Sequence, residues 1–590
     1  MKNTKKAVYK TEWNFKLFYK NEKDPQIEQD VLKAEKAYTD FANKYKDTDK
    51  YLTDSGALLN ALNDYEKLEE NATNKPLMYF NYLKDINSSN SYAEAQLNKL
   101  IARYTNSANQ IIFFGLKIGK ITKEKQFEFL NDKSLSHYHY FLKTIFDTAK
   151  YDLSEAEEKI LNITSQTSRN MWIDGFDKLL SKQVLKHKGK EIPLQEALGI
   201  IPGLGTKDRR DLHNKAVAKM REVSDFAEAE INAVYTDKKI RDELRGFKEP
   251  YESTVLRYQN DPEVVRNLVE TVTKFFTISQ RFFRVKAKIL KDKKLTYADR
   301  SASAGKINKK FDLETSINLV SNAFAKVDSK YVEMFKSFLK NGQVDVYPRK
   351  GKTGGAYCSH NLHTPTLVLL NHTDDLRAVS TIAHEFGHAF HSELSKSQSP
   401  IYQDYTISVA EVASTLFENF VFDELFETLS EKEKIIALHN QINDDVSTIF
   451  RQIACFNFEY ELHKKIRTEG AVSKEEIAKL MNKHMSAYLG PVFKMQENDG
   501  YFFVNWSHIR NFFYVYSYAF GQIISKALYA EYKKDRKFLL KIEEFLKAGG
   551  STSPETIFKN IGIDVRDPSF FESGLRSIEE DIKRLEKLIK

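Results

Sequence analysis

Residues that break helices are scarce in this chain, which has 23 glycines and 12 prolines among 590 residues. Lys, Glu, Leu and Ala, which favour helices, are abundant. At 30–45, apolar residues recur at alternating three- and four-residue steps and therefore share one helix face. Asp152 and Ser154 are candidate N-caps ahead of an acidic first turn. The sequence predicts a mainly α-helical fold that is long enough to bury a large core.

Two stretches interrupt the helical pattern. The first, 188–210, is rich in glycine and proline. It predicts a boundary between an N-terminal helical lobe, residues 1–198, and a second domain, residues 199–590. The second stretch, 342–373, combines Gly, Pro and β-branched residues in short segments that are typical of strands joined by turns. We expect a small β-sheet there, as the only clear β region, with helices from there to the end of the chain.

The charge pattern narrows the classes of partner. The 90 basic and 82 acidic residues are interleaved along the chain, and the net charge is +8. This pattern is typical of solvated helix faces and argues against a nucleic-acid partner. No apolar run approaches the roughly 18 residues of a membrane span, and the N-terminal stretch lacks the apolar core of a signal peptide. The sequence therefore predicts a cytoplasmic protein without a membrane partner, and it predicts free thiols at Cys358 and Cys455.

The segment 380–394, STIAHEFGHAFHSEL, holds three of the 14 histidines. In its H-E-x-x-H pattern, His384 and His388 share one helix face and can bind the same zinc ion. Glu385 is offset around the helix, where it can approach a water molecule without being a ligand. Burying such polar groups is costly without partners, which a metal ion supplies. We therefore predict a site for one Zn²⁺ ion on this helix.

The third zinc ligand is expected from another helix. His391 lies near the face of His384, but seven residues rise about 10 Å along a helix, too far for one ion to bridge regularly. We expect His391 to support a ligand or to line the cleft. The next amphipathic segment, 408–425, carries Glu411, which is the predicted third ligand. Ser414 shares its face, and Glu418, two turns further along, could orient a ligand.

These motifs resemble a known family. AHEFGHAFH followed by VAEVAS is similar to the oligoendopeptidase F and thimet oligopeptidase family of zinc metallopeptidases, and is closest to the oligoendopeptidase F branch. GGAYCS before the motif and the segments 508–521 and 548–571 match as well, whereas the N-terminal lobe matches more weakly. The resemblance implies an elongated helical molecule of two lobes around a deep channel for short peptides. Residues 199–590 would form its catalytic domain.

The resemblance also implies roles for individual residues. Glu385 would be the catalytic base, with His384, His388 and Glu411 as zinc ligands. The segment HIRNFFYVYSY matches the part of the family that stabilises the transition state with a histidine and tyrosines. It points to His508, and we expect Tyr514 and Tyr518 to act because they would share a helix face. Tyr516 is expected to pack in the core.

The sequence therefore favours a zinc-dependent endopeptidase that hydrolyses internal bonds of short oligopeptides. An exopeptidase of the same architecture, such as a dipeptidyl carboxypeptidase, is the nearest alternative. A non-catalytic peptide-binding relative and a structural zinc protein are others, the last with Cys358 or His360 completing a closed site. The β region would pair with the extended substrate backbone through Gly355, Ala356 and Tyr357. The sequence specifies neither the cleavage preference nor the oligomeric state.

Overall fold

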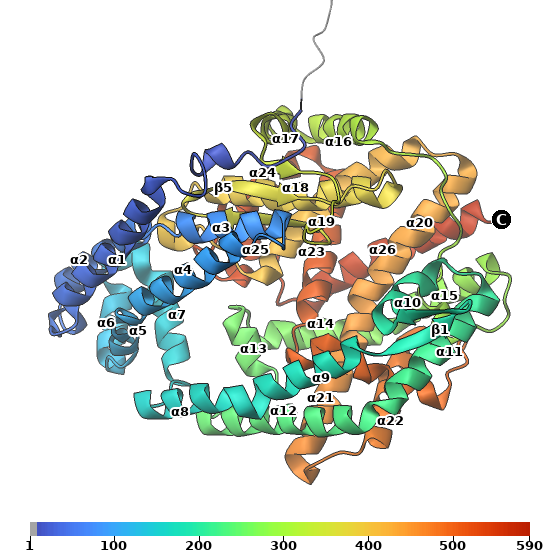
Figure 1. The fold of residues 1–590 in the computed structure, drawn as a ribbon, viewed down its shortest axis with the longest axis horizontal. Helices are drawn as coiled ribbons and strands as arrows, with labels where there is room; N and C mark the ends of the chain where they lie inside the picture. Colours follow the sequence, from blue (N-terminus) through green and yellow to red (C-terminus); the bar gives the residue numbers. More distant parts are fainter. Residues whose placement is uncertain (1–8) are drawn as a thin grey trace, which may run out of the picture. The chain divides into compact units, whose positions relative to one another are not determined.

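The computed structural model describes residues 9–590, of which most are helical (Figure 1). Helices make up 72% of the structure and the described residues contain only two small sheets, so the predicted mainly α fold is confirmed. The lysine-rich start of the chain, for which no signal peptide is predicted, lies partly outside the described residues, at residues 1–8. Among the described residues, no helix has the length and apolar character to span a membrane.

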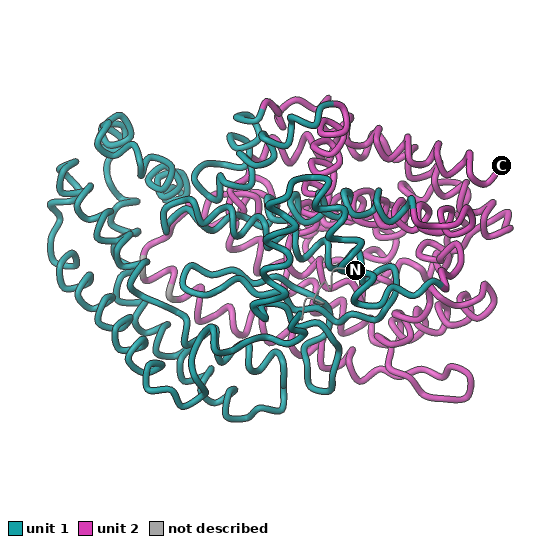
Figure 2. Tube along the Cα trace, turned by 90° about the horizontal axis from the view of Figure 1, so that it is seen from above, with its two compact units in different colours: residues 1–150, 309–427, 535–561 teal, residues 151–308, 428–534, 562–590 magenta. Residues whose placement is uncertain are grey.

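The chain divides into two compact units, and each is made of three separate segments (Figure 2). Residues 1–150, 309–427 and 535–561 form unit 1, and residues 151–308, 428–534 and 562–590 form unit 2. The predicted boundary after residue 198 falls inside a segment of unit 2. The domain boundary after residue 198 and the arrangement of two lobes around a channel remain predictions.

Unit 1 contains a three-stranded sheet and these helices: α1 Pro25–Tyr45, α2 Ser55–Asn71, α3 Lys75–Ile86, α4 Ser91–Asn109, α5 Ile112–Gly119, α6 Lys123–Asn131, α7 His139–Ala149, α16 Leu313–Val327, α17 Ser329–Asn341, α18 Leu376–Ser395, α19 Ile407–Glu427, α24 Leu539–Lys547 and α25 Pro554–Asn560. The face predicted at 30–45 is buried in α1 through Val31, Ala34 and Phe41.

The sheet of unit 1 lies against the helix that carries the histidine motif. Its strands, β3 Val344–Asp345, β4 Tyr357–Asn361 and β5 Thr364–Leu369, are ordered β3-β5-β4. β5 is parallel to β3 and antiparallel to β4, which leaves β4 at an edge. Both β4 and β5 contact α18, and Figure 1 shows β5 beside α18. Thr366 on β5 donates a hydrogen bond to Glu393 on α18 at 2.6 Å. The predicted sheet beside this helix is confirmed.

Helices α18 and α19 cross at unusually short range. A Cβ atom on Gly387 of α18 would lie 2.6 Å from the Cα of Ser414 and 2.8 Å from the carbonyl oxygen of Ala413, both on α19. Beside this crossing, Phe390 of α18 packs against Phe417 of α19 with ring centroids 4.9 Å apart. A residue without a side chain at position 387 is therefore what allows the two backbones to approach.

Unit 2 is built from these helices: α8 Glu155–Ser165, α9 Met171–Ser181, α10 Leu194–Ile200, α11 Thr206–Glu222, α12 Ser224–Arg245, α13 Glu252–Arg257, α14 Pro262–Lys274, α15 Phe276–Ile289, α20 Glu431–Asp445, α21 Arg451–Glu469, α22 Lys474–Leu489, α23 Tyr516–Lys534 and α26 Pro568–Leu588. Ser154 caps α8 with a complete capping box. Two π-helical turns, η4 Gln166–Asn170 and η8 Val446–Phe450, interrupt longer helical runs.

Unit 2 contains a second sheet, so the prediction of a single β region, at 342–373, is wrong. β1 Val184–His187 and β2 Lys190–Pro193 form an antiparallel hairpin. Its two-residue turn has positive φ at both positions, 49° at Lys188 and 80° at Gly189, as a tight hairpin turn requires. The strands bury little apolar surface, with Leu185 as the one fully buried residue among them. The hydrophobic pattern therefore gave little indication of them.

The crossing of α18 and α19 predicts that Gly387→Ala destabilises the protein by about 1–3 kcal/mol, because the added methyl group meets backbone atoms that cannot move independently. Thermal unfolding should show a lower Tm. The matched control is Gly115→Ala in α5, where a Cβ meets no atom within 4 Å. That change should leave stability unchanged or raise it by up to about 1 kcal/mol. Equal Tm values for the two variants would contradict the close-approach argument.

Candidate metal centre and active site

Three side chains of unit 1 converge as a metal site would require. His384, His388 and Glu411 each offer one ligand atom, and these atoms all lie within 4.8 Å of one another. The histidines stand on successive turns of α18, with ring centroids 4.9 Å apart, and Glu411 comes from α19 across the Gly387 crossing. Among the described residues, this is the one such group of three or more His, Cys, Asp or Glu residues.

Two further residues of α19 contact this group. Nδ1 of His384 donates a hydrogen bond to Glu418 Oε1 at 2.5 Å, while Nε2 of His384 lies 3.7 Å from Glu411 Oε2. The hydroxyl of Ser414 donates to Glu411 Oε2 at 3.2 Å. A histidine whose Nδ1 is held by a carboxylate presents Nε2 in a fixed direction, which is a common arrangement around metal ligands.

The donor set suits zinc. Two imidazole nitrogens and one carboxylate oxygen are ligands of catalytic zinc sites, where a fourth position stays open. Neither Cys358 nor His360 belongs to the group, so the described residues do not form the closed four-ligand site of a structural zinc protein. The residues present therefore fit one zinc ion held by three protein ligands.

The electrostatics of this cluster are dominated by burial and carboxylates. Burial would lower the pKa of His384, but the bond to Glu418 and the charges of Glu418, Glu385 and Glu411 raise it to about 9. Burial, together with the charge of His384, lowers the pKa of His388 well below its usual value. Burial is the main cause that raises the pKa of Glu385, to about 7; the charge of His384 opposes this rise, and the charges of Glu411 and Glu418 contribute to it. A cation bound here would offset this excess of negative charge.

Glu385 lies beside the three converging residues without being one of them. Its side chain is buried, and it accepts a hydrogen bond from the backbone N–H of Cys358 on edge strand β4. This contact could not be predicted from the sequence, because it depends on the direction in which the N–H groups of one strand point. Glu385 is thus held between α18 and the sheet.

His391 is fully buried one turn after His388. Its ring stacks on Tyr405 with centroids 3.6 Å apart, and neither ring nitrogen has a hydrogen-bond partner among the described residues. Burial, with the charge of His360, lowers its pKa to about 3. His391 does not belong to the group of three. A supporting role for it stays a prediction.

The segment Gly355–Tyr357 leads into strand β4. Gly355 has φ of 75°, and its carbonyl accepts a hydrogen bond from the Asn371 side chain at 2.7 Å. The hydroxyl of Tyr357 donates to Asp85 at 2.6 Å, and Ala356 is half-buried between them. One edge of β4 pairs with β5 and, in the described sheet, the other edge pairs with no strand. This edge offers backbone groups close to Glu385.

The remaining predicted residues form a cluster within unit 2. His508 Nε2 lies 3.3 Å from the hydroxyl of Tyr518, and the rings of Tyr514 and Tyr518 meet edge to face at 5.1 Å. The prediction that both tyrosines lie on one helix is wrong, because α23 begins only at Tyr516.

A backbone distortion just before Tyr514 explains this difference. Phe512 and Phe513 have φ of 46° and 58°, which is rare for bulky residues and ends any regular helix there. Tyr514 nevertheless reaches Tyr518. The predicted core position of Tyr516 is confirmed, since it is fully buried and its hydroxyl donates to Asn260 at 2.9 Å.

Known proteins are similar to this chain in sequence. The profile of Peptidase family M3 matches residues 207–577, and that of Oligopeptidase F matches residues 117–182. Oligopeptidase PepF of Bacillus subtilis is 25% identical, over 87% of this chain and 78% of its own length. An oligoendopeptidase F homolog of Borreliella burgdorferi is 27% identical, over 89% of this chain and 93% of its own length.

Solved structures share the fold. A protein from Chlamydophila abortus matches with a TM-score of 0.84 at 23% identity, with 98% of each chain covered. Oligoendopeptidase-F from Enterococcus faecium matches with a TM-score of 0.68 at 17% identity, covering 96% of this chain and 97% of its own. At such identities the likeness concerns the fold, which in these proteins is the same mainly α-helical arrangement.

The contact between His384 and Glu418 predicts a measurable effect on metal binding. Glu418→Ala removes the carboxylate that orients the ring, so zinc affinity should fall by about 10–100-fold. Competition with a chromophoric chelator would measure it. Glu427→Ala, at the exposed end of the same helix, is the matched control and should keep the affinity of the parent. An unchanged affinity in Glu418→Ala would show that Glu418 does not orient His384.

Proposed function

This chain belongs to peptidase family M3 and is a metallopeptidase, and from this premise we propose that it is a zinc-dependent endopeptidase that hydrolyses internal bonds of short oligopeptides. The observation that carries the proposal is the convergence of His384, His388 and Glu411 with Glu385 beside them. The names of the relatives, oligopeptidase and oligoendopeptidase F, support the substrate class. We also propose that it acts in the cytoplasm.

We propose that His384, His388 and Glu411 hold the zinc ion. When bound, zinc supplies a Lewis acid that polarises a carbonyl group and makes water more acidic. Glu418 fixes the ring of His384, and Ser414 fixes the carboxylate of Glu411. These contacts keep the ligand atoms in place without a fourth protein ligand, so that one side of the site stays free for substrate and water.

Glu385 is the proposed general base. Its buried carboxylate takes a proton from the attacking water molecule and delivers that proton to the nitrogen of the leaving amine. The hydrogen bond from the N–H of Cys358 holds the carboxylate in position while it changes its protonation state. Burial matters here, because proton transfer is most efficient when the pKa of the base is close to the working pH.

The substrate backbone is proposed to pair with the edge of β4, entered through Gly355, Ala356 and Tyr357. An extended peptide added to a sheet edge gains main-chain hydrogen bonds whatever its side chains are. His508, Tyr514 and Tyr518 are the proposed donors to the oxyanion that develops on the scissile carbonyl. The roles of His508, Tyr514 and Tyr518 follow from the family resemblance.

An end-blocked oligopeptide, acetylated and amidated, tests the proposal. The zinc-loaded protein should cleave it, a chelator should abolish cleavage, and zinc should restore it. Glu385→Gln should keep zinc but lose about 10²–10⁴ in turnover, because only the proton acceptor is removed. His388→Ala and Glu411→Ala should lose zinc, and His391→Ala should retain it as the control. Full activity in metal-free protein would contradict the proposal, and cleavage of unblocked peptides alone would favour an exopeptidase.

Hydroxyl deletion tests the tyrosines. Tyr514→Phe or Tyr518→Phe should reduce turnover by about 10²–10³-fold with zinc content and KM nearly unchanged, because the lost bond forms in the transition state. Tyr516→Phe is the control. It should keep its turnover but lose about 1 kcal/mol of stability, because the buried Asn260 oxygen loses a donor. Parental turnover in both active-site variants would leave the cluster without a catalytic role.

A further inference from the structure

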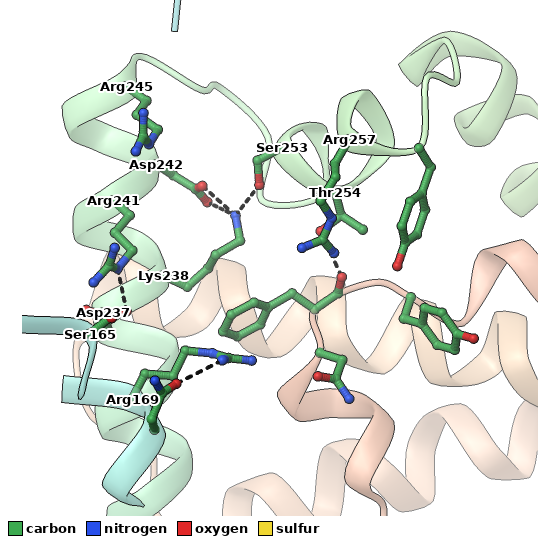
Figure 3. Close-up of a pocket in the computed structure, with 15 residues that line it drawn as sticks. Ser165, Arg169, Asp237, Lys238, Arg241, Asp242, Arg245, Ser253, Thr254 and Arg257 are labelled. Atoms are coloured by element: carbon green, nitrogen blue, oxygen red, sulfur yellow. Dashed lines mark hydrogen bonds and ion pairs between the residues drawn. The ribbon is translucent and has the colours of Figure 1, made fainter. Parts of the chain in front are cut away.

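Unit 2 contains a cavity whose cationic side chains take part in no step of the proposed mechanism (Figure 3). Its volume is about 580 Å³. Its cations come from three separate elements, namely the π-helical turn η4, helix α12 and helix α13. Five cationic side chains and only two carboxylates line the cavity: Arg169, Lys238, Arg241, Arg245 and Arg257, and Asp237 and Asp242.

Internal ion pairs neutralise only part of this charge. Lys238 is paired with Asp242, but Arg467 also binds that carboxylate, at 2.5 Å. Arg241 is paired with Asp237 at 2.7 Å. Arg245 is likewise bound by Glu158 at 2.6 Å. The paired cations thus use up every carboxylate of the cavity.

Two guanidinium groups are left over. Arg169 and Arg257 form no ion pair within the described residues. Arg169 donates to the carbonyl of Arg510 at 2.9 Å and stands over the ring of Phe512, and Arg257 lies over the ring of Tyr258. Burial lowers the pKa of Arg169. The nearby charge of Asp237 opposes this shift, and the charges of Arg241 and Arg257 add to it. The cavity therefore has an excess of positive charge suited to an anion.

The wall of the cavity is shared with the histidine–tyrosine cluster. Tyr514 lines the cavity and also contacts Tyr518. The strained Phe512 is held by Thr254, which donates to its carbonyl at 2.9 Å, and the N–H of Phe513 donates to Glu459 at 3.0 Å. Backbone strain of this kind persists where the surroundings fix it, often at ligand sites. An anion in the cavity would lie next to Tyr514.

We propose that this cavity binds a carboxylate of the peptide substrate through Arg169 and Arg257, beside Tyr514. Guanidinium groups bind carboxylates in a planar, charge-assisted geometry. The carboxylate is either that of the peptide C-terminus or that of an Asp or Glu side chain at one position of the peptide. The inference rests on the proposed function, since it assigns a binding preference to the same substrates.

Direct binding tests the inference without turnover. Short acetylated peptides of neutral sequence are titrated calorimetrically into chelator-treated protein, each as a free acid and as an amide. A second series of amides carries one Asp at successive positions. The parent protein should prefer one carboxylate-bearing class by about 10–100-fold, as expected for hydrogen bonds to a charged group. Preference for free acids identifies the C-terminus, and preference for one Asp position identifies a side chain.

The variants Arg169→Gln and Arg257→Gln should abolish that preference while binding of the neutral amides stays unchanged. Arg284→Gln, an exposed change of equal charge on α15, should retain it. Equal binding of acids and amides by the parent protein, or a preference that survives both substitutions, overturns the inference. Carboxylate-selective binding by a protein that hydrolyses no peptide when loaded with zinc would overturn the proposed function and leave the cavity assignment standing.

Discussion

The close contact between α18 and α19 at Gly387 is the constraint on which the proposed metal centre depends. Two helices that meet backbone to backbone have a fixed distance and little freedom to slide, because interiors are closely packed. That contact places Glu411 opposite the two histidines and Glu418 opposite Nδ1 of His384. The glycine inside the H-E-x-x-H motif thus serves packing, while its neighbours His384, Glu385 and His388 are the proposed zinc ligands and general base.

The protein places opposite charge excesses in its two units. In unit 1, Glu385, Glu411 and Glu418 gather around two imidazoles, an environment that favours a cation. In unit 2, guanidinium groups outnumber carboxylates around a cavity, an environment that favours an anion. In neither unit do the surrounding side chains neutralise the excess charge, and burying uncompensated charge costs free energy. The charges of unit 1 therefore favour binding of a cation, and those of unit 2 favour binding of an anion.

Features governed by local periodicity could be predicted from the sequence, and features governed by long-range geometry could not. The two helices of the proposed metal centre each follow from a residue pattern within their own segment of the sequence. The first pattern also gives the spacing of His384 and His388, and the second places Glu411 on the partner helix. The distorted backbone at Phe512, between predicted helical residues, has no such signal because Thr254 and Glu459 fix it from distant segments. The cavity could not be predicted from the sequence either, because the residues that line it come from three stretches far apart in the chain.

The interleaving of the two units has a consequence for biosynthesis. Helix α18 of unit 1 packs against α24, which belongs to the last segment of that unit, residues 535–561. During synthesis the ligands of the metal centre leave the ribosome long before this segment does, and a compact unit forms only when its parts are present. A nascent chain therefore carries the chemical groups of a peptidase without the packing that positions them. Proteolytic competence would then arise only after residues 535–561 have emerged.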